Sequence, residues 1–232
     1  MRLAIVTNDY PPKLGGIQQY LGSFVAAWPH PVRVLGPKVT QSEAAGDPDY
    51  VTRGPHRFMW PTPGVARWVA GEVADFDADV VLFGAPYPLP SLGSGLRKRL
   101  GVRCAVLAHG AEVLVPSALP GVRQVFAAPL RSADALLAVS GFTQRKLARL
   151  TKRTVHFVGA GVDTAAFTPR TWILRDVPIV GCVSRFVPRK GQHRLIEAAA
   201  TLRDAGRPVQ VLMVGRGRTE GALRRLAAER GV

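Results

Sequence analysis

Short apolar runs alternate with stretches of helical spacing along almost the whole chain. The runs predicted to be strands are 2–7, 32–35, 80–83, 104–108, 135–139, 155–158, 177–183 and 209–214, and 38–58 is expected to be loop with an edge strand. The stretches predicted to be helices are 17–28, 63–76, 91–100, 122–132, 142–151, 191–205 and 219–231. Such alternation is typical of a parallel, doubly wound sheet, so the sequence predicts an α/β fold.

A break in this pattern divides the chain. Glycine, proline and threonine interrupt all periodicity over 159–176, which we interpret as a linker between a domain at 1–158 and a second unit at 177–232. Two strands and two helices cannot cover both faces of a parallel sheet, and a unit of this size is marginal alone. We therefore expect a truncated second domain, or one that leans on the first domain or on a partner.

The chain is strongly basic, with a formal charge of +15 over 232 residues. Residues 177–232 hold 11 basic and 4 acidic side chains and so carry +7 of this charge, and the rest is spread over 1–176. Phosphorylated substrates, an anionic membrane surface or nucleic acid would all suit such a charge. No nucleic-acid reader motif accompanies it, so nucleic acid is the least favoured partner.

Other features of the sequence point to the cytosol. No apolar run is long enough to span a bilayer, and the first apolar run is too brief for a secretory signal. Cys104 and Cys182 each lie inside an apolar strand-like run, so we expect two buried thiols and no disulfide. No metal-ligand spacing occurs, and we expect no metal.

The stretch SRFVPRKGQ is the most informative one for function. It places Arg185 and Lys190 between the end of a strand and the start of a helix, where open α/β sheets bind ligands and helix N-termini favour anions. A planar guanidinium and a compact ammonium together suit a diphosphate. The alternative is a pair of solvated loop cations.

A second strand–loop–helix junction, NDYPPKLGGIQQY, pairs Gly15 and Gly16 at the start of a helix. Glycine allows the backbone to approach a phosphate or sugar closely, and the alternative is a plain turn. Gly215 likewise follows a strand, where it suits a phosphate or ribose, although its spacing is not that of the dinucleotide fingerprint.

Polar groups follow two further strands. His109 stands just past a strand end in LAHGAEV, where it could bind a substrate hydroxyl or serve as a structural histidine. Glu112 beside it is a candidate for the acceptor side or a solvated acid. Ser140 is predicted to cap the helix that follows it. The basic runs at 97–103 and 145–153 are expected either to face anionic lipid headgroups or to be solvated helix faces.

Taken together, NDYPPKLGGIQQYL, HGAEV, VSGFT, GAGVDTAAFTP and SRFVPRKGQ resemble the retaining GT-B glycosyltransferases of family 4. The resemblance runs from Arg2 to Val232 and is nearest to the actinobacterial mannosyltransferases that make phosphatidylinositol mannosides from GDP-mannose. It implies two Rossmann-like domains, no metal, and transfer of a hexose, mannose above all, with retention. It also implies a second domain about twice as long as this one.

The resemblance assigns roles to the candidate residues. Arg185 and Lys190, with Gly215, would hold the donor diphosphate, and Gly15 and Gly16 would let the first helix approach it. His109 would contact the transferred sugar. Asn8, Asp9, Tyr10 and Glu112 would lie near a lipid or glycan acceptor, at the inner face of the cell membrane.

Two alternatives stay open on the sequence alone. The shortness of the second unit favours a non-catalytic fragment that binds a nucleotide or phosphosugar, or a form of the enzyme with little activity. The charge alone would also suit a basic membrane-surface module.

Overall fold

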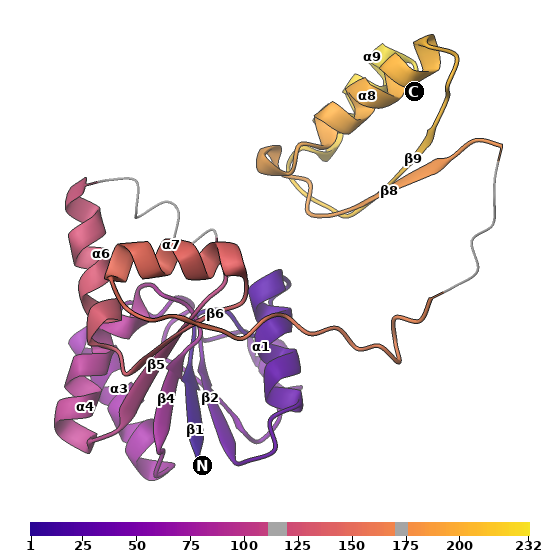
Figure 1. Ribbon diagram of the computed structural model, residues 1–232. Helices are drawn as coiled ribbons and strands as arrows, with labels where there is room; N and C mark the ends of the chain where they lie inside the picture. The colour runs from indigo at the N-terminus through magenta and orange to yellow at the C-terminus, as the bar shows by residue number, and fades with distance from the viewer. Residues whose placement is uncertain (111–119, 170–175) are drawn as a thin grey trace. The chain divides into compact units, whose positions relative to one another are not determined.

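The computed structural model describes residues 1–110, 120–169 and 176–232. These residues form two compact units, Met1–Val162 and Asp163–Val232 (Figure 1). The boundary between the units lies within the segment 159–176 that was expected to be a linker.

Unit 1 is built on a seven-stranded sheet in which every pair of strands is parallel, in the order β3-β2-β1-β4-β5-β6-β7. The strands are β1 Leu3–Val6, β2 Val32–Gly36, β3 Val51–Arg53, β4 Val80–Phe83, β5 Arg103–Ala108, β6 Ala135–Ala138 and β7 His156–Phe157. The predicted α/β architecture with a parallel sheet is confirmed.

The helices of unit 1 lie close to their predicted positions. They are α1 Gly16–Ala26, α2 Gln41–Ala44, α3 Pro63–Asp75, α4 Gly93–Leu100, α6 Pro120–Ser132 and α7 Gly141–Thr151, with a short 3-10 helix at Leu89–Leu92. The Ser140 hydroxyl accepts from the Thr143 backbone N–H and caps α7 as predicted. Helix α2 was not predicted, although Thr40 and Glu43 form the capping box that starts it.

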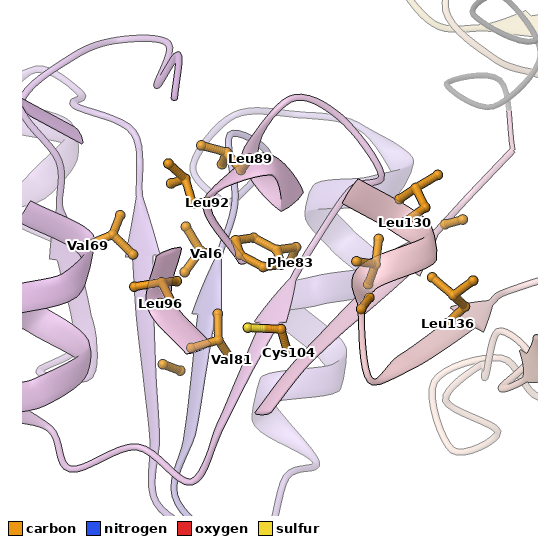
Figure 2. Packing of buried hydrophobic residues seen from close by; sticks show 14 of the residues in the cluster. Val6, Val69, Val81, Phe83, Leu89, Leu92, Leu96, Cys104, Leu130 and Leu136 are labelled. Atoms are coloured by element: carbon orange, nitrogen blue, oxygen red, sulfur yellow. The ribbon is translucent and has the colours of Figure 1, made fainter. Parts of the chain in front are cut away.

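Both faces of this sheet are buried. Ala4 and Val6 of β1 point into one apolar cluster, which α3, α4, α6 and α7 complete, whereas Leu3 and Ile5 point into a second cluster with α1. Figure 2 shows side chains of the first cluster packed between strands and helices. This burial on both faces explains why the strands read as continuous apolar runs.

Unit 2 is smaller and is covered on one side. Strands β8 Ile179–Val183 and β9 Gln210–Val214 pair in parallel, and helices α8 Gln192–Asp204 and α9 Glu220–Arg230 follow them. The helices enclose a small core around Phe186, Ile196 and Leu223. Val183, Leu212 and Val214 remain 82%, 57% and 48% exposed, so the other face of the sheet is bare.

Gly84, directly after β4, fills a position with no room for a side chain. A Cβ there would lie 2.8 Å from Thr7 Oγ1 and 2.9 Å from Leu21 Cδ1, both of which are buried. Gly71 in α3 is the matched opposite, because nothing lies within 4 Å of a Cβ at that position.

We predict that Gly84→Ala lowers the free energy of unfolding by about 2 kcal/mol, because overpacking forces the Thr7 and Leu21 side chains to move. Gly71→Ala should raise the free energy of unfolding by about 0.5–1 kcal/mol, since alanine stabilises the interior of a helix relative to glycine and position 71 is exposed. Urea denaturation measures both. Equal effects of the two substitutions would contradict this packing.

The two cysteines should differ in reactivity. Burial raises the pKa of the Cys104 thiol to about 11, and Cys104 lies in the core of unit 1. Because the thiolate is the reactive form, we expect Cys104 to stay unmodified by a disulfide reagent at pH 8 until the protein unfolds. Cys182 is only half-buried and should react in the folded protein. Fast native modification of both thiols would contradict the burial of Cys104.

Candidate functional site

The strand order of unit 1 reverses at β1, whose two neighbours are β2 and β4. In open parallel sheets ligands bind outside the carboxyl ends of the strands at such a reversal. The segments that follow β1, β4 and β5 begin at Thr7, Gly84 and His109, so all three meet at this edge. We call it the carboxyl edge of unit 1.

The loop after β1 is held by a buried amide. The Asn8 side chain donates to the Met59 carbonyl at 3.1 Å and accepts from the Met59 N–H at 2.7 Å, and Asn8 is only 6% exposed. The β1–α1 loop is thereby joined to the segment that follows β3. The Asn8 amide therefore has a structural role in joining these two segments, and its predicted place near an acceptor stays a prediction.

The next two residues differ in exposure. Asp9 is part-exposed, and its carboxylate accepts from Gln18 Nε2 at 2.7 Å and lies 3.6 Å from Lys13 Nζ. The Tyr10 ring is 5% exposed within the core, and burial raises the pKa of its hydroxyl well above the usual range, with Tyr50 adding to the effect. Of the three predicted acceptor-side residues that the structure describes, Asn8 and Tyr10 are buried and Asp9 is partly exposed.

Helix α1 begins at Gly16 with Gly15 as its N-cap. A Cβ at Gly15 would lie 2.3 Å from Gln18 Oε1, whereas a Cβ at Gly16 would meet nothing within 4 Å. The first turn carries no acidic residue. The start of α1 therefore carries no side chain at Gly15 or Gly16 and no acidic residue in its first turn, two features that suit an anion at a helix N-terminus.

His109 stands one residue past β5. Its Nε2 lies 3.0 Å from the Gly84 carbonyl, and its ring meets Tyr20 of α1 edge-on, with centroids 5.2 Å apart at 81°. A carbonyl can only accept, so this contact assigns the proton to Nε2. The imidazole is thus oriented from two elements. Glu112 lies outside the described residues.

In unit 2 the loop after β8 carries the predicted cations. It passes through a 3-10 turn, Pro188–Lys190, and reaches α8 through Gly191, which has a left-handed φ of 70°. Gln192 is 2% exposed and donates to Ser184 Oγ at 2.9 Å and to the Arg185 carbonyl at 2.8 Å. This buried amide fixes the backbone that bears Arg185.

Five exposed basic side chains gather around this helix N-terminus: Arg185, Arg189, Lys190, His193 and Arg194. Within the described part of the chain, none of the five forms an ion pair. A hollow of about 450 Å³ opens among residues 188–191, 193 and 194. The four arginine and lysine side chains among them are cations at a helix N-terminus without an acidic partner among the described residues, and they attract a phosphate group strongly.

Gly215 has a packing reason to be glycine. A Cβ there would lie 2.0 Å from the Ser184 carbonyl oxygen, and one at Gly217 would lie 2.2 Å from that of Phe186. The Phe186 N–H donates to the Arg216 carbonyl at 2.9 Å, so the loops after β8 and β9 lie against each other. The predicted contact of Gly215 with the donor stays a prediction.

Over 1–110, 120–169 and 176–232, no three His, Cys, Asp or Glu side chains come together as a metal site. None of the helices in these ranges has the length and apolar character that crossing a bilayer demands.

Comparison with known families decides the assignment. The profile described as Glycosyltransferase Family 4 matches residues 14–166, and that of Glycosyl transferases group 1 matches residues 169–232. The chain belongs to glycosyltransferase family 4.

The curated relatives of this family member are named as mannosyltransferases. The chain is 38% identical, over 97% of its length, to a GDP-mannose-dependent monoacylated alpha-(1-6)-phosphatidylinositol monomannoside mannosyltransferase of Corynebacterium glutamicum. It is 35% identical, over 99% of its length, to a GDP-mannose-dependent alpha-(1-6)-phosphatidylinositol monomannoside mannosyltransferase of Mycolicibacterium smegmatis. It spans 64% and 65%, respectively, of the length of these two proteins.

Solved structures confirm the GT-B fold. The Anabaena protein HepE, in complex with UDP, matches all of this chain and 66% of its own with a TM-score of 0.75 at 15% identity. The lipopolysaccharide outer core galactosyltransferase WaaB matches all of this chain and 65% of its own with a TM-score of 0.64 at 13% identity.

Several residues that support the candidate site were not predicted from the sequence. These are Gln18, Tyr20, Gly84 and Gln192, together with the backbone of Met59. Gln18 and Tyr20 lie in the motif NDYPPKLGGIQQY, in which only the two glycines and Asn8, Asp9 and Tyr10 were given a role. The contacts of Asn8 and His109 span 51 and 25 residues, which local patterns do not reveal.

We predict that Asn8→Ala lowers the free energy of unfolding by about 3 kcal/mol, because it leaves the buried N–H and carbonyl of Met59 without partners. Gln124→Ala, which removes an exposed amide from α6, is the control and should change it by less than about 0.5 kcal/mol. Urea denaturation followed by circular dichroism gives both values. Equal stability of the two variants would show that the hydrogen bonds between Asn8 and Met59 do not stabilise the fold.

Proposed function

We propose that this chain carries the donor-binding and acceptor-binding elements of a retaining mannosyltransferase that uses GDP-mannose and a phosphatidylinositol mannoside. The observation that carries the proposal is the placement of Arg185 and Lys190, with no described carboxylate paired to either, at the N-terminus of α8. The names of the curated relatives support the nucleotide sugar and the lipid acceptor.

The donor diphosphate gains negative charge as the sugar leaves it. Fixed donors aimed at that charge stabilise the transition state more than the ground state. Arg185 supplies a planar pair of donors and Lys190 a compact charge. Within unit 1 taken by itself, the N-terminus of α1 at Gly15 and Gly16 is the positive end of that helix and is a separate candidate for an anion.

The transfer step balances within the two substrates. The bond between the sugar C1 and the β-phosphate oxygen breaks, and the acceptor hydroxyl oxygen bonds to C1 on the same face. The hydroxyl proton passes to the leaving phosphate. His109, oriented by the Gly84 carbonyl and the Tyr20 ring, holds a hydroxyl of the transferred sugar and does not act as the nucleophile.

A second function has its own observation. The exposed apolar face of the β8–β9 sheet favours a module that binds the nucleotide sugar without transferring it. Binding with no transfer would distinguish it. The lipid acceptor would place either form at an anionic membrane surface, at the inner face of the cell membrane.

We predict that Arg185→Ala and Lys190→Ala each weaken binding of GDP, measured by calorimetry, and slow mannosyl transfer where it occurs. Removing one such donor should cost about 2–4 kcal/mol of transition-state stabilisation. Arg207→Ala, an exposed cation at the opposite ends of the same strands, is the control and should behave as the wild type. Wild-type GDP affinity in both site variants would overturn the donor assignment.

A further inference from the structure

Three aromatic side chains form an exposed cluster on unit 1. Phe58, Trp60 and Tyr87 are 45%, 51% and 52% exposed. The rings of Phe58 and Trp60 are 5.2 Å apart, and those of Trp60 and Tyr87 are 6.0 Å apart. Tyr87 in turn lies 6.1 Å from Phe126, which is 3% exposed. We call Phe58, Trp60 and Tyr87 the aromatic cluster. It is anchored to the core at one end and open to solvent along the rest.

The backbone beneath the cluster is fixed. Met59, between Phe58 and Trp60, is fully buried, and both of its backbone polar groups bond to the Asn8 amide. Met59 points inward, whereas Phe58 and Trp60 on either side of it are about half exposed. The buried hydrogen bonds between Asn8 and Met59 thus fix a backbone segment on which two large rings are exposed to solvent. The core of unit 1 does not need these two rings for its packing.

The cluster lies at the carboxyl edge of unit 1. Phe58 and Trp60 follow β3, and Tyr87 follows β4, directly after the Gly84 carbonyl that orients His109. Leu14, 90% exposed in the loop before α1, lies at the same edge. The exposed apolar side chains therefore share an edge with the proposed sugar-binding residue.

The three segments that supply the rings of the cluster and Phe126 carry charge of one sign. Residues 54–62, 84–92 and 120–132 contain three arginines and no aspartate or glutamate. Arg57 is adjacent to Phe58, and Arg123 precedes Phe126 by one turn of α6; both arginines are exposed. Tryptophan and tyrosine rings with neighbouring arginines are the combination that bilayer interfaces favour, and anionic headgroups complement the charge.

The basic runs considered in the sequence analysis end at the other edge of the sheet. Helices α4 and α7 finish where β5 and β7 begin, so Lys98, Arg99 and Lys152 lie at the amino ends of the strands. Arg97 is paired with Asp134 at 2.9 Å, and Arg153 donates to backbone carbonyls. Membrane contact through these ends would turn the candidate site away from the lipid.

We propose that the aromatic cluster docks the chain on an anionic lipid bilayer, with Phe58 and Trp60 in the interfacial zone and Arg57 on the headgroups. The docking would bring the carboxyl edge to the lipid acceptor. The inference rests on the proposed function for its purpose alone, because binding to vesicles needs neither donor nor transfer.

Co-sedimentation of the 232-residue chain with phosphatidylcholine vesicles holding 30% phosphatidylglycerol tests the proposal at physiological salt. We expect Trp60→Ala and Phe58→Ser each to lower the partition coefficient at least fivefold. The matched control is Lys98→Ala/Arg99→Ala, which removes two exposed cations from the opposite edge and should stay within twofold of the wild type. Thermal unfolding confirms that each variant is folded.

Brominated acyl chains provide a second readout. The fluorescence of the wild type should be quenched on vesicles of brominated lipid, and Trp60→Phe should abolish most of that quenching while it preserves binding. Three results would overturn the proposal: wild-type partition in both cluster variants, loss of binding in the Lys98/Arg99 control alone, or a self-associating wild type that Trp60→Ala makes monomeric without a change in vesicle binding. GDP binding in the same variants stays intact, so failure here is distinct from failure of the donor assignment.

Discussion

Parallel pairing of the strands is the constraint on which the rest of this structure depends. It sends the carboxyl end of every strand in a sheet to one edge and starts each following helix there, with the positive end of its dipole outward. In unit 1 this constraint brings together the N-terminus of α1, His109 and the loops after β3 and β4. In unit 2 it places five basic side chains around the start of α8.

Each unit stabilises this edge in the same physical way. A buried amide stands close to the end of the first strand and hydrogen-bonds a loop: Asn8 joins the Met59 backbone, and Gln192 joins the Arg185 carbonyl. Glycines complete the support where two backbones or packed side chains leave no space, as at Gly84 and Gly215. Residues that never touch a substrate thus determine where the exposed groups point.

Much of the fold could be predicted from the sequence, because burial on both faces gives each strand a continuous apolar run. Because the end of each apolar run marks the end of a strand, His109, Arg185 and Lys190 could be predicted to lie in segments that follow the carboxyl ends of strands. The capping box at Thr40 was visible in the sequence and was overlooked. Tyr10 was expected near an acceptor because of the motif in which it lies. The fold buries its ring beside Tyr50, and this burial depends on contacts that the motif does not show.

Other features could not be predicted from local patterns. The outward display of Phe58 and Trp60 depends on the contact between Met59 and Asn8, 51 residues apart. The crowding at Gly215 depends on Ser184, across two loops. Such contacts form only when the sheet assembles, so no periodicity in the sequence predicts them.

Hydrogen–deuterium exchange with and without GDP-mannose tests the central claim most directly, because it reports on backbone N–H groups at both helix N-termini. The account predicts slower exchange on donor binding at residues 15–19 and 184–192, with little change at the amino ends of the strands. Protection confined to the amino ends, or none at saturating donor, would contradict it.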